Sequence, residues 1–407
     1  MSELELLADE MEGRLCAAVV SGGVLTDLYV DPANATAGWG SIYLGKVVKI
    51  DTRLEAALVD LGGGITGYLA AKHVRTPDSD ESETRTGLSE MLSGGQMVLA
   101  QVKAEGRHRT KNENVKLPRL TMKVYVPGQF LAYSPTSRQV TISHRIENEK
   151  TLALTAKLKS KCGWIVQHHA QKASDGEIER ESRYLEESWK NILSARDARQ
   201  GNPGLLKEGP NALFRALGDY GASSFEHIHA GNKKVLDMMT GWSERHMPAL
   251  ASSRRLRLFR PSVSGQSLFD THDIHTEIGK AQESLVPLAS GGTIIIEPTS
   301  AITVIDVNQG GADNIPEINL SAAREIARQS RIRNLSGALL IDFIGMDRKS
   351  ERLRLLETLA KNFADDFAGA QVHGYTRLGI VEVTRKRRTA TLSESLGKQA
   401  CLPLRTV

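Results

Sequence analysis

Short runs of alternating apolar and polar residues dominate the amino-terminal part of the chain. Residues 14–31 are typical of two strands around a Ser-Gly-Gly turn. Further alternating runs at 40–51, 55–62, 66–74 and 96–105 are typical of the strands of a small barrel, and a long polar loop precedes the last of them. About five short strands with one long loop predict an OB-type barrel, a common platform for single-stranded nucleic acid.

The pattern becomes less regular beyond the predicted barrel. We expect residues 138–146 and 163–170 to form strands of a further small unit. Residues 175–198 combine many charges with helical spacing of their apolar positions, which predicts an amphipathic helix. Residues 201–214 contain glycines and prolines, and we interpret them as a loop that marks a boundary.

An apolar run at 302–311, with the sequence ITVIDVNQGG, carries polar residues where the predicted strand ends. Because side chains alternate along a strand, Asp306 and Asn308 are expected on the same face. Gly310 and Gly311 then permit a turn with unusual backbone angles. A carboxylate and an amide are therefore predicted at the exit of this strand.

A second apolar run at 337–347 carries another acid, Asp342. The residues between the two runs predict a helix over 319–335. A strand–helix–strand unit places both strand ends on the same edge, where ligands usually bind. We therefore expect Asp306 and Asp342 to converge there, at a cost in free energy unless they are paired or hold a cation.

A divalent cation removes the repulsion between two neighbouring carboxylates, and oxygen ligands suit magnesium, with manganese as the alternative. Such a cation polarises a phosphoryl oxygen and activates a bound water. Asn308 would support one carboxylate, and Arg324, Arg328 and Arg331, which share one face of the predicted helix, would hold a phosphodiester. This set predicts metal-assisted phosphodiester hydrolysis. The alternative is that each acid caps a helix or ends a strand in a hydrogen bond.

Composition adds few constraints. The 407 residues are 40% hydrophobic and 25% charged, as in soluble globular proteins, and the length suggests about two to four domains. A net charge of +4 permits an anionic partner without demanding one. No apolar stretch reaches membrane-spanning length, the amino terminus has no signal-peptide pattern, and the three cysteines are far apart, so we expect a cytoplasmic protein without a disulfide framework.

Two histidine pairs and a basic run are further candidate sites. His272 and His275 would ligate zinc only on a shared helix, and without an evident third ligand we expect ordinary polar or capping roles. His168 and His169 are predicted on opposite faces of a strand, which excludes a shared site there. The basic run 385–388 is compatible with a solvated surface or buried salt bridge and equally with phosphate contact.

Ordered segments spread over residues 14–396 resemble the bacterial ribonuclease E/G family, most densely in 291–392. The resemblance implies a magnesium-dependent endoribonuclease that cuts single-stranded, A/U-rich RNA in RNA processing or decay. The segments are GSIYLGKVVKI, EAALVDLG with GYL, RLT with VPGQFL, TVIDVN, AAREIARQSRIRNLSGALLIDFIGMD and RLGIVEVTRKR.

The fold implied by this resemblance is a multidomain protein of mixed α and β structure. It has a split RNase H-like domain, an inserted OB-fold RNA-binding domain, a 5′-sensor-like subdomain and a DNase I-like catalytic domain. The implied boundaries are 1–36 for the first RNase H-like segment, 37–124 for the OB fold of the S-one type, 125–200 for the sensor-like subdomain, 201–262 for the second RNase H-like segment, 263–396 for the catalytic domain and 397–407 for a carboxyl-terminal tail.

The resemblance also assigns roles to individual residues. Asp306 and Asp342 match the family's two magnesium ligands, and Asn308 matches the residue that supports them. The family's two base-holding aromatics fall on Leu58 and Tyr68, and leucine packs against a base without stacking as a ring does. Further RNA-binding positions of the family fall on Lys116, His144 and Arg145.

Several departures from the family pattern change the expectation. The family's 5′-sensor positions fall on Gln167, His168 and Gly369, which lack its charge-assisted donors. We therefore predict weak or absent sensing of a 5′-monophosphate, unless His168 or His169 substitutes. The zinc link has only Cys401, with Leu404 at the second thiolate position, so zinc is not expected and the assembly state stays open. The segment after Asn308 is also shorter, and a long scaffold tail is not expected.

Three classes of function therefore compete. The first is a ribonuclease of the E/G type with single-stranded RNA as its partner. The second is an RNA-binding relative with little or no cleavage activity, and the third is a metal-dependent DNA nuclease or phosphoesterase. Retention of Asp306, Asp342 and Asn308 favours an enzyme over a pure binder.

Overall fold

The computed structural model divides the chain into two compact units, and each is described by itself. Unit 1 comprises Met1–Ala33, Ile228–Gly231 and Phe259–Val407, and unit 2 comprises Asn34–His227 and Asn232–Leu258. The structure describes residues 3–32, 37–75, 87–107, 116–135, 137, 139–143, 146, 153, 158, 163–251, 253–311 and 313–397.

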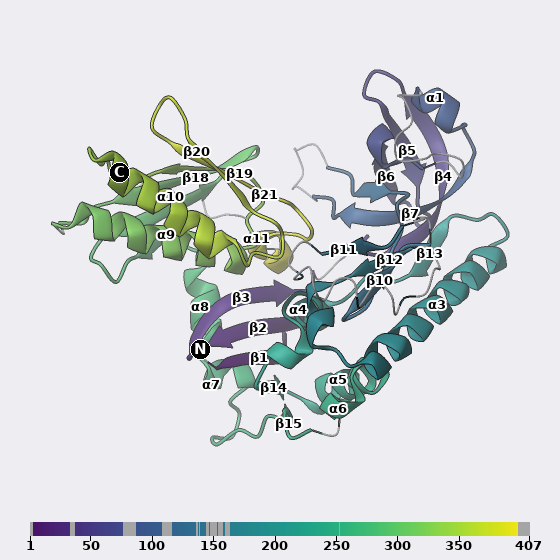
Figure 1. Cartoon of the computed structure of the whole chain (residues 1–407), viewed down its shortest axis with the longest axis horizontal. Helices are drawn as coiled ribbons and strands as arrows, with labels where there is room; N and C mark the ends of the chain where they lie inside the picture. Colours follow the sequence, from purple (N-terminus) through teal and green to yellow (C-terminus); the bar gives the residue numbers. More distant parts are fainter. Residues whose placement is uncertain are drawn as a thin grey trace. The chain divides into compact units, whose positions relative to one another are not determined.

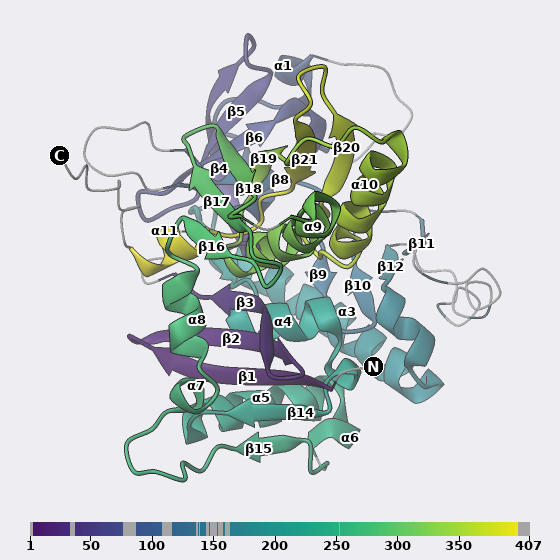
Figure 2. The ribbon, with the colours of Figure 1, turned by 90° about the vertical axis from the view of Figure 1, so that its left-hand side faces the viewer.

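Unit 1 contains a six-stranded mixed sheet in the order β16-β17-β18-β19-β21-β20. Figure 1 labels β18 to β21, and Figure 2 also labels β16 and β17. Its two central strands, β18 and β19, are parallel, and the other pairings are antiparallel. Helix α9 connects the two parallel strands, and α10 follows β19. The bounds are β16 Leu285–Pro287, β17 Thr293–Pro298, β18 Ile302–Asn308, α9 Ile315–Ile332, β19 Gly337–Asp342, α10 Lys349–Phe363, β20 Gln371–Tyr375 and β21 Val381–Arg385.

Alternation of side chains sorts this sheet into a buried face and a more open face. On β18, Ile305 and Val307 are buried in an apolar core shared with α9 and α10. Val304, Asp306 and Asn308 alternate with them and are half-buried or exposed. The polar residues at the end of β18 therefore lie on the face that the two helices leave uncovered.

A second sheet has the strand order β15-β14-β1-β2-β3 (Figure 2). The predicted turn at 22–23 is confirmed, because β2 (Arg14–Ser21) and β3 (Val24–Val30) pair across it. Strand β1 (Leu4–Met11) was not predicted, because its acidic residues hide a run of four buried residues. The remaining elements are β14 (His227–Ala230), β15 (Leu256–Leu258), α7 (Leu268–Thr271), α8 (Ile274–Lys280) and α11 (Leu392–Leu396).

Unit 2 contains a closed barrel of five strands, as the alternating pattern predicted. The strands pair in the order β4-β5-β6-β8-β7, and an additional β4–β7 pairing closes the ring, while β13 pairs with β4. The barrel interior is apolar. The bounds are β4 Ile42–Asp51, β5 Ala56–Asp60, β6 Thr66–Ala70, η1 Ala71–His73, α1 Leu88–Met91, β7 Met97–Ala104, β8 Arg119–Thr121 and β13 Gly204–Lys207.

The rest of unit 2 contains a four-stranded sheet and several helices. Helix α3 (Asp175–Ala198) has the predicted bounds, and a capping box between Ser174 and Glu177 fixes its start. The region predicted as a loop at 201–214 instead contains β13 and the start of α4. The remaining bounds are β9 Val126–Pro127, β10 Leu131–Tyr133, β11 Thr141–Ile142, β12 Trp164–Val166, η2 His168–Lys172, α4 Ala212–Tyr220, η3 Ala222–Ser224, α5 Lys233–His246 and α6 Pro248–Ala251.

The prediction that His168 and His169 lie on opposite faces of a strand is wrong. Strand β12 ends at Val166, and both histidines lie in the 3₁₀-helix η2, with ring centroids 3.7 Å apart. His169 is buried, its Nε2 bonds the Asp219 carbonyl at 3.0 Å, and burial lowers the pKa of its imidazole. The pair is therefore part of the packing of unit 2.

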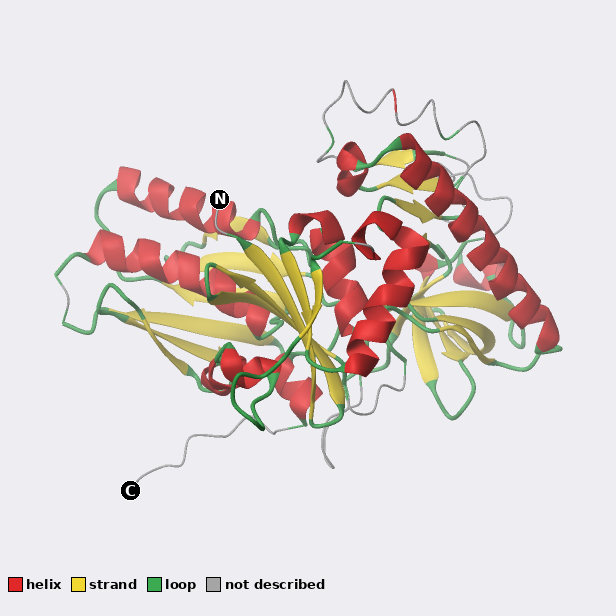
Figure 3. Cartoon of the chain, turned by 90° about the horizontal axis from the view of Figure 1, so that it is seen from below, coloured by secondary structure: helices red, strands yellow, loops and turns green. Residues whose placement is uncertain are grey.

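The class of the protein is mixed α and β, as Figure 3 shows by the abundance of both helices and strands. The finer assignment of RNase H-like and DNase I-like domains, and the boundaries given above, stay predictions. None of the helices in the described ranges is long and apolar enough to cross a membrane.

Candidate active site

Asp306 and Asp342 are direct neighbours across the two parallel strands. In the register of β18 and β19, Ile305 is opposite Ile341 and Asp306 is opposite Asp342. Each acid lies at or next to the carboxyl end of its strand, at the same edge of the sheet. The backbone register therefore brings together the two carboxylates that the sequence predicted would converge.

Asn308 is held against one of these acids. Its Nδ2 donates a hydrogen bond of 2.8 Å to Oδ2 of Asp306. Directly after it, Gly310 and Gly311 adopt φ values of 60° and 86°, so the chain turns with the left-handed angles that glycine permits. A side chain at Gly310 would also collide with the carbonyl oxygen of Gly291, because the two turns approach closely.

Asn319 fixes the exit of the second strand, a role that the sequence pattern did not indicate. It is fully buried on α9; its Nδ2 donates to the Ile344 carbonyl at 2.7 Å, and its Oδ1 accepts from the Ile344 amide at 3.1 Å. Ile344 lies two residues beyond Asp342, so this clamp positions the backbone that carries the carboxylate. The sequence could have indicated this role, because Asn319 is a polar residue at a position that lies on the buried face of α9.

The two acids are less buried than the apolar runs suggested. Asp342 is exposed and Asp306 is half-buried, because both point to the face opposite α9 and α10. Solvent therefore reaches both side chains. The segments that follow β18 and β19, with the starts of α9 and α10, line a hollow of about 520 Å³ at the same edge. Its charged lining residues are Asp313, Asp347, Glu351 and Arg348.

The donor set at this edge fits a magnesium ion that keeps most of its water. Within the described ranges, no group of three or more histidine, cysteine or acidic side chains is placed to hold a metal. Asp306 and Asp342 together supply two carboxylates, and magnesium is usually bound by one or two carboxylates with water and phosphate as its other ligands. This oxygen-only set is unsuited to zinc, which favours nitrogen and sulfur.

The arginines of α9 do not support the predicted phosphodiester contact. Arg328 donates to the Leu25 carbonyl at 2.8 Å and pairs with Glu325, and Arg331 donates to the Thr26 carbonyl at 3.3 Å. Leu25 and Thr26 belong to β3, so these two arginines hold α9 against that strand of unit 1. The prediction failed because a shared helix face does not reveal what that face packs against.

Arg324 is paired as well, but at the surface. Its Nη2 lies 2.9 Å from the Glu317 carboxylate, and both side chains are about half exposed. The three arginines of α9 are therefore used within unit 1 itself.

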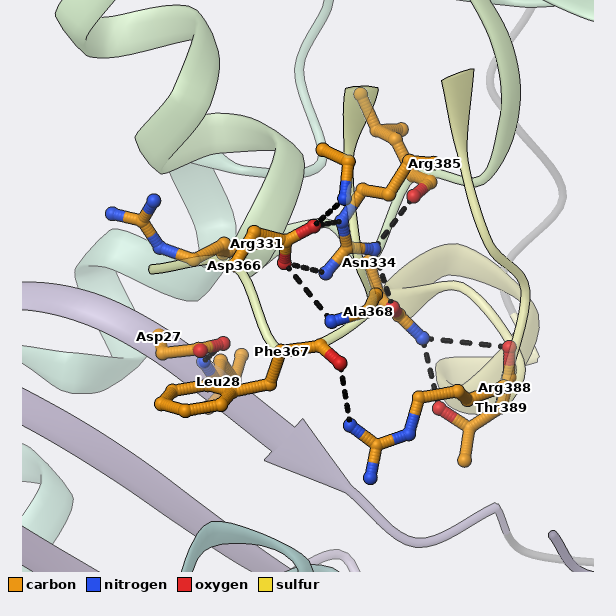
Figure 4. A network of polar contacts seen from close by, with 12 residues as sticks. Asp27, Leu28, Arg331, Asn334, Asp366, Phe367, Ala368, Arg385, Arg388 and Thr389 are labelled. Atoms are coloured by element: carbon orange, nitrogen blue, oxygen red, sulfur yellow. Dashed lines mark hydrogen bonds and ion pairs between the residues drawn. The ribbon is translucent and has the colours of Figure 1, made fainter. Parts of the chain in front are cut away.

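The basic run at the end of β21 is largely structural (Figure 4). Arg385 is buried, and its Nε and Nη2 both bond the Asp366 carboxylate at 3.0 Å. Its Nη1 donates to Asn334 Oδ1 and to the Leu335 carbonyl. Arg387 pairs with Glu394 at 2.9 Å. This network anchors β21 where it pairs with the start of β19, at the opposite end from Asp342.

The barrel presents the two predicted base-holding residues side by side. Leu58 on β5 is the register partner of Tyr68 on β6, and both are half-buried on the outer face. Lys49 is the partner of Leu58 on one side, and Arg119 is the partner of Tyr68 on the other. The register thus produces a row of cation, leucine, tyrosine and cation, whose two flanking cations were not predicted from the sequence.

The other predicted RNA-binding positions are less informative. Lys116 is exposed next to the barrel, and its backbone forms an isolated antiparallel β-bridge with that of Arg107. His144 and Arg145 lie outside the described residues, so their predicted role stays a prediction.

The three positions of the predicted degenerate 5′-sensor lie in the part of the chain that the structure describes. The Gln167 amide donates to the carbonyls of Gly128 and Leu131, at 2.9 and 3.1 Å. Gly369 has φ of 76°, and the Lys386 ammonium lies 3.7 Å from where its Cβ would be. His168 packs on His169, as described above.

The predicted zinc positions differ in what the structure describes. Cys401 and Leu404 lie outside the described residues. His272 and His275 do not share a helix, because His272 follows α7 as its carboxyl-terminal cap, whereas His275 lies in α8. Burial raises the pKa of the Cys16 thiol to about 12, which makes it a poor ligand and nucleophile at neutral pH.

Comparison with known proteins identifies the family to which the chain is similar. A model of the Ribonuclease E/G family matches residues 125–388. Ribonuclease G of Escherichia coli (strain K12) is 28% identical over 410 residues, which cover 96% of this chain and 81% of the relative. Ribonuclease G of Haemophilus influenzae is 30% identical over 414 residues, covering 97% and 82%.

Ribonuclease E of Synechocystis sp. is 32% identical over 377 residues, covering 88% of this chain and 54% of the relative. The family model spans more than half of the 407 residues. The chain therefore belongs to the ribonuclease E/G family.

Proposed function

We propose that this protein is a magnesium-dependent endoribonuclease that hydrolyses phosphodiester bonds of single-stranded, A/U-rich RNA in RNA processing or decay. Family membership supports the endoribonuclease activity. The observation that carries the catalytic assignment is the direct pairing of Asp306 with Asp342 across two parallel strands. Magnesium, the A/U preference and the cutting of single strands are parts of the proposal.

The chain's own residues define where the scissile phosphate would lie. Two neighbouring carboxylates repel each other and the phosphate, and a cation held by Asp306 and Asp342 would offset that repulsion. Asn308 donates to Oδ2 of Asp306, which orients that carboxylate and leaves its other oxygen available. Bound magnesium would supply Lewis-acid polarisation of a phosphoryl oxygen and a more acidic water.

The outer face of the barrel supports recognition of a single strand. Base faces pack on Tyr68 and, more weakly, on Leu58, because a tyrosine ring stacks on a base and a leucine does not. Lys49 and Arg119 flank this pair and attract phosphates on either side. Bases in a duplex are already stacked and covered, so this row favours unpaired RNA.

Sensing of a 5′-monophosphate is proposed to be weak or absent. A terminal phosphate is held best by charged donors, and the Gln167 amide is neutral and already donates to two carbonyls. Cleavage rates of matched 5′-monophosphate and 5′-hydroxyl RNAs should therefore be similar. A large preference for the monophosphate would show that other cations, such as Lys386 beside Gly369, supply the contact.

The experiment that tests the catalytic proposal compares Asp306→Asn with the wild type on a labelled single-stranded A/U-rich RNA, with magnesium titrated. We expect cleavage to be abolished while RNA binding is largely retained, because the variant removes a charge from the acid pair and leaves the barrel intact. Glu382→Gln is the matched control, since Glu382 is an exposed carboxylate on β21 of the same sheet. Unchanged cleavage by Asp306→Asn would refute the assignment.

The same assay separates the second candidate, an RNA-binding relative with little cleavage activity. The observation that favours this candidate is the lack of charged side chains at positions 167 and 369, which are Gln167 and Gly369. RNA binding by the wild type without cleavage at any magnesium concentration would support it over the enzyme.

A further inference from the structure

Five basic side chains gather at one end of the barrel, next to the row that carries Tyr68. We call this set the His73 cluster. Its members come from η1, β7, β8 and the segment after β8, and all but the histidine are exposed. They are Lys72, His73, Lys103, Arg119 and Lys123.

Backbone and side-chain contacts hold the centre of the cluster together. The Met122 amide donates to the His73 carbonyl at 2.9 Å, which joins η1 to the segment after β8. The Lys103 Nζ lies 3.2 Å from the His73 Nε2. An ammonium group has only donors, so the imidazole accepts this bond and carries its own hydrogen on Nδ1. Lys103 lies at an irregularity of β7, next to Ala104, which is the register partner of Arg119, and both cations act on the His73 ring.

The pKa of His73 also reflects the positive charges around it. Its pKa is lowered from 6.5 to about 4, first by burial and then by the positive charges of Lys103, Lys72, Lys123 and Arg119. The four charges that act on the ring most strongly are therefore all positive. Gathering like charges costs free energy, and an anion between them would recover it.

The cluster continues the row of the candidate RNA-binding face. Arg119 belongs to both, because it is the register partner of Tyr68 on one side and of Ala104 on the other. A strand whose base rests on Tyr68 would thus lead its next phosphates toward Lys103 and Lys123. Continuity with an aromatic platform favours nucleic acid over an acidic protein segment as the occupant.

We propose that the His73 cluster binds the phosphodiester backbone of single-stranded RNA, one or a few nucleotides from the base that rests on Tyr68. The inference deepens the proposed function, on which it rests for the identity of the strand. The cluster supplies backbone affinity without reading sequence, because point charges on lysines contact phosphates and not base edges. Every nucleotide of an RNA strand carries the same phosphate group. The cluster would therefore bind RNAs of different sequence with similar affinity.

The first test measures binding alone, so that it does not depend on catalysis. Full-length protein carrying Asp306→Asn binds a fluorescent single-stranded A/U-rich RNA at a series of salt concentrations. Lys72→Ala with Lys123→Ala should reduce the slope of log affinity against log salt by about 1.4, since each phosphate contact on a single strand contributes about 0.7. The matched control removes two exposed lysines from α3 and α10, with Lys190→Ala and Lys361→Ala, and should leave the slope unchanged.

The second test observes His73 directly. Histidine-labelled protein is titrated by NMR with and without the RNA, and His73→Gln identifies the resonance. A phosphate beside the ring should raise the His73 pKa from about 4 by about one unit or more, because a negative charge favours the imidazolium. Inorganic phosphate alone serves as a second probe of the same position.

These outcomes decide the inference separately from the proposed enzyme activity. An unchanged salt slope together with an unchanged His73 pKa would overturn it, even if the wild type cleaves RNA. Binding of a poly-glutamate peptide as tight as that of the RNA would also overturn it, in favour of an acidic protein partner. A reduced slope with a raised His73 pKa would support it even if no cleavage were found.

Discussion

The acid edge of unit 1 and the outer face of the barrel in unit 2 are both made by strand register, but they are supported differently. Asp306 and Asp342, which form the acid edge, lie on the paired strands β18 and β19, and the buried Asn319 clamp fixes the backbone just beyond Asp342. The barrel face carries exposed cations around Leu58 and Tyr68 on an apolar interior.

This difference follows from what each region is proposed to do. A reacting phosphate requires atoms held within fractions of an ångström, so the acid edge is stabilised by directional hydrogen bonds. Holding an extended strand requires charge and contact area, which tolerate variation such as leucine in place of an aromatic ring. Substitutions should therefore have sharp effects at the acid edge and graded effects on the barrel.

The largest effect is expected from Asp342→Asn. It removes one charge from the acid pair and should lower the cleavage rate by about 10⁴-fold, equivalent to some 5 kcal/mol in the barrier. Single-turnover cleavage of a labelled RNA measures the change. Glu297→Gln, an exposed acid on the neighbouring strand β17, should cleave normally. A rate within tenfold of the wild type would show that substitutions at the acid edge affect function no more strongly than substitutions on the barrel.

Arg385→Ala should have the next largest effect, on the free energy of unfolding. It leaves Asp366 as a buried carboxylate without its partner, at an expected cost of about 3 to 5 kcal/mol. Urea unfolding followed by circular dichroism measures this cost. Arg387→Ala, which removes a more exposed pair with Glu394, should cost about 1 kcal/mol or less. Equal losses from the two variants would contradict the structural role of the buried network.

Leu58→Phe should produce a smaller, graded effect, on RNA binding by the barrel face. It restores a ring beside Tyr68 and should tighten single-stranded RNA binding by about 1 kcal/mol, roughly fivefold, through stacking. The Asp306→Asn background permits this measurement without cleavage. Leu58→Met keeps the apolar volume without a ring and should bind as the wild type does, so an equal gain from both variants would exclude stacking as the cause.

The smallest effect is expected for His73→Gln, on the pH dependence of stability. The His73 pKa is about 4 in the folded barrel and 6.5 in its ordinary state, so between these values the unfolded chain binds more protons. The folded state therefore loses stability as pH falls from 6.5 toward 4, and His73→Gln should reduce that loss. Urea midpoints at about pH 7 and about pH 5 measure it, with the exposed His373→Gln for comparison.

Sequence patterns predicted the elements whose signals are local. Helix α3 has a capping box at its start and helical spacing throughout, and the barrel strands alternate cleanly, so both were predicted well. Strand β1 was missed because its acidic residues resemble an exposed terminus. The turn at Gly310 and Gly311 was predicted from glycine's conformational freedom alone.

Contacts between distant segments were predicted less well. The strand–helix–strand order predicted that Asp306 and Asp342 would converge. It did not predict that the two residues are direct register partners across β18 and β19. The role of Asn319 and the use of Arg328 and Arg331 depend on what α9 packs against, which its periodicity does not show. The cations beside Leu58 and Tyr68 likewise emerge only from the pairing of four strands.

The parallel pairing of β18 with β19 also limits which changes in chain length this protein can accept. Inserting or deleting one residue within either strand would turn its acid from the open face toward the helices, because side chains alternate with a period of two. The turn after Asn308 lies beyond the pair and carries no such constraint. Variation in length should therefore accumulate between β18 and α9 and be excluded from the strands themselves.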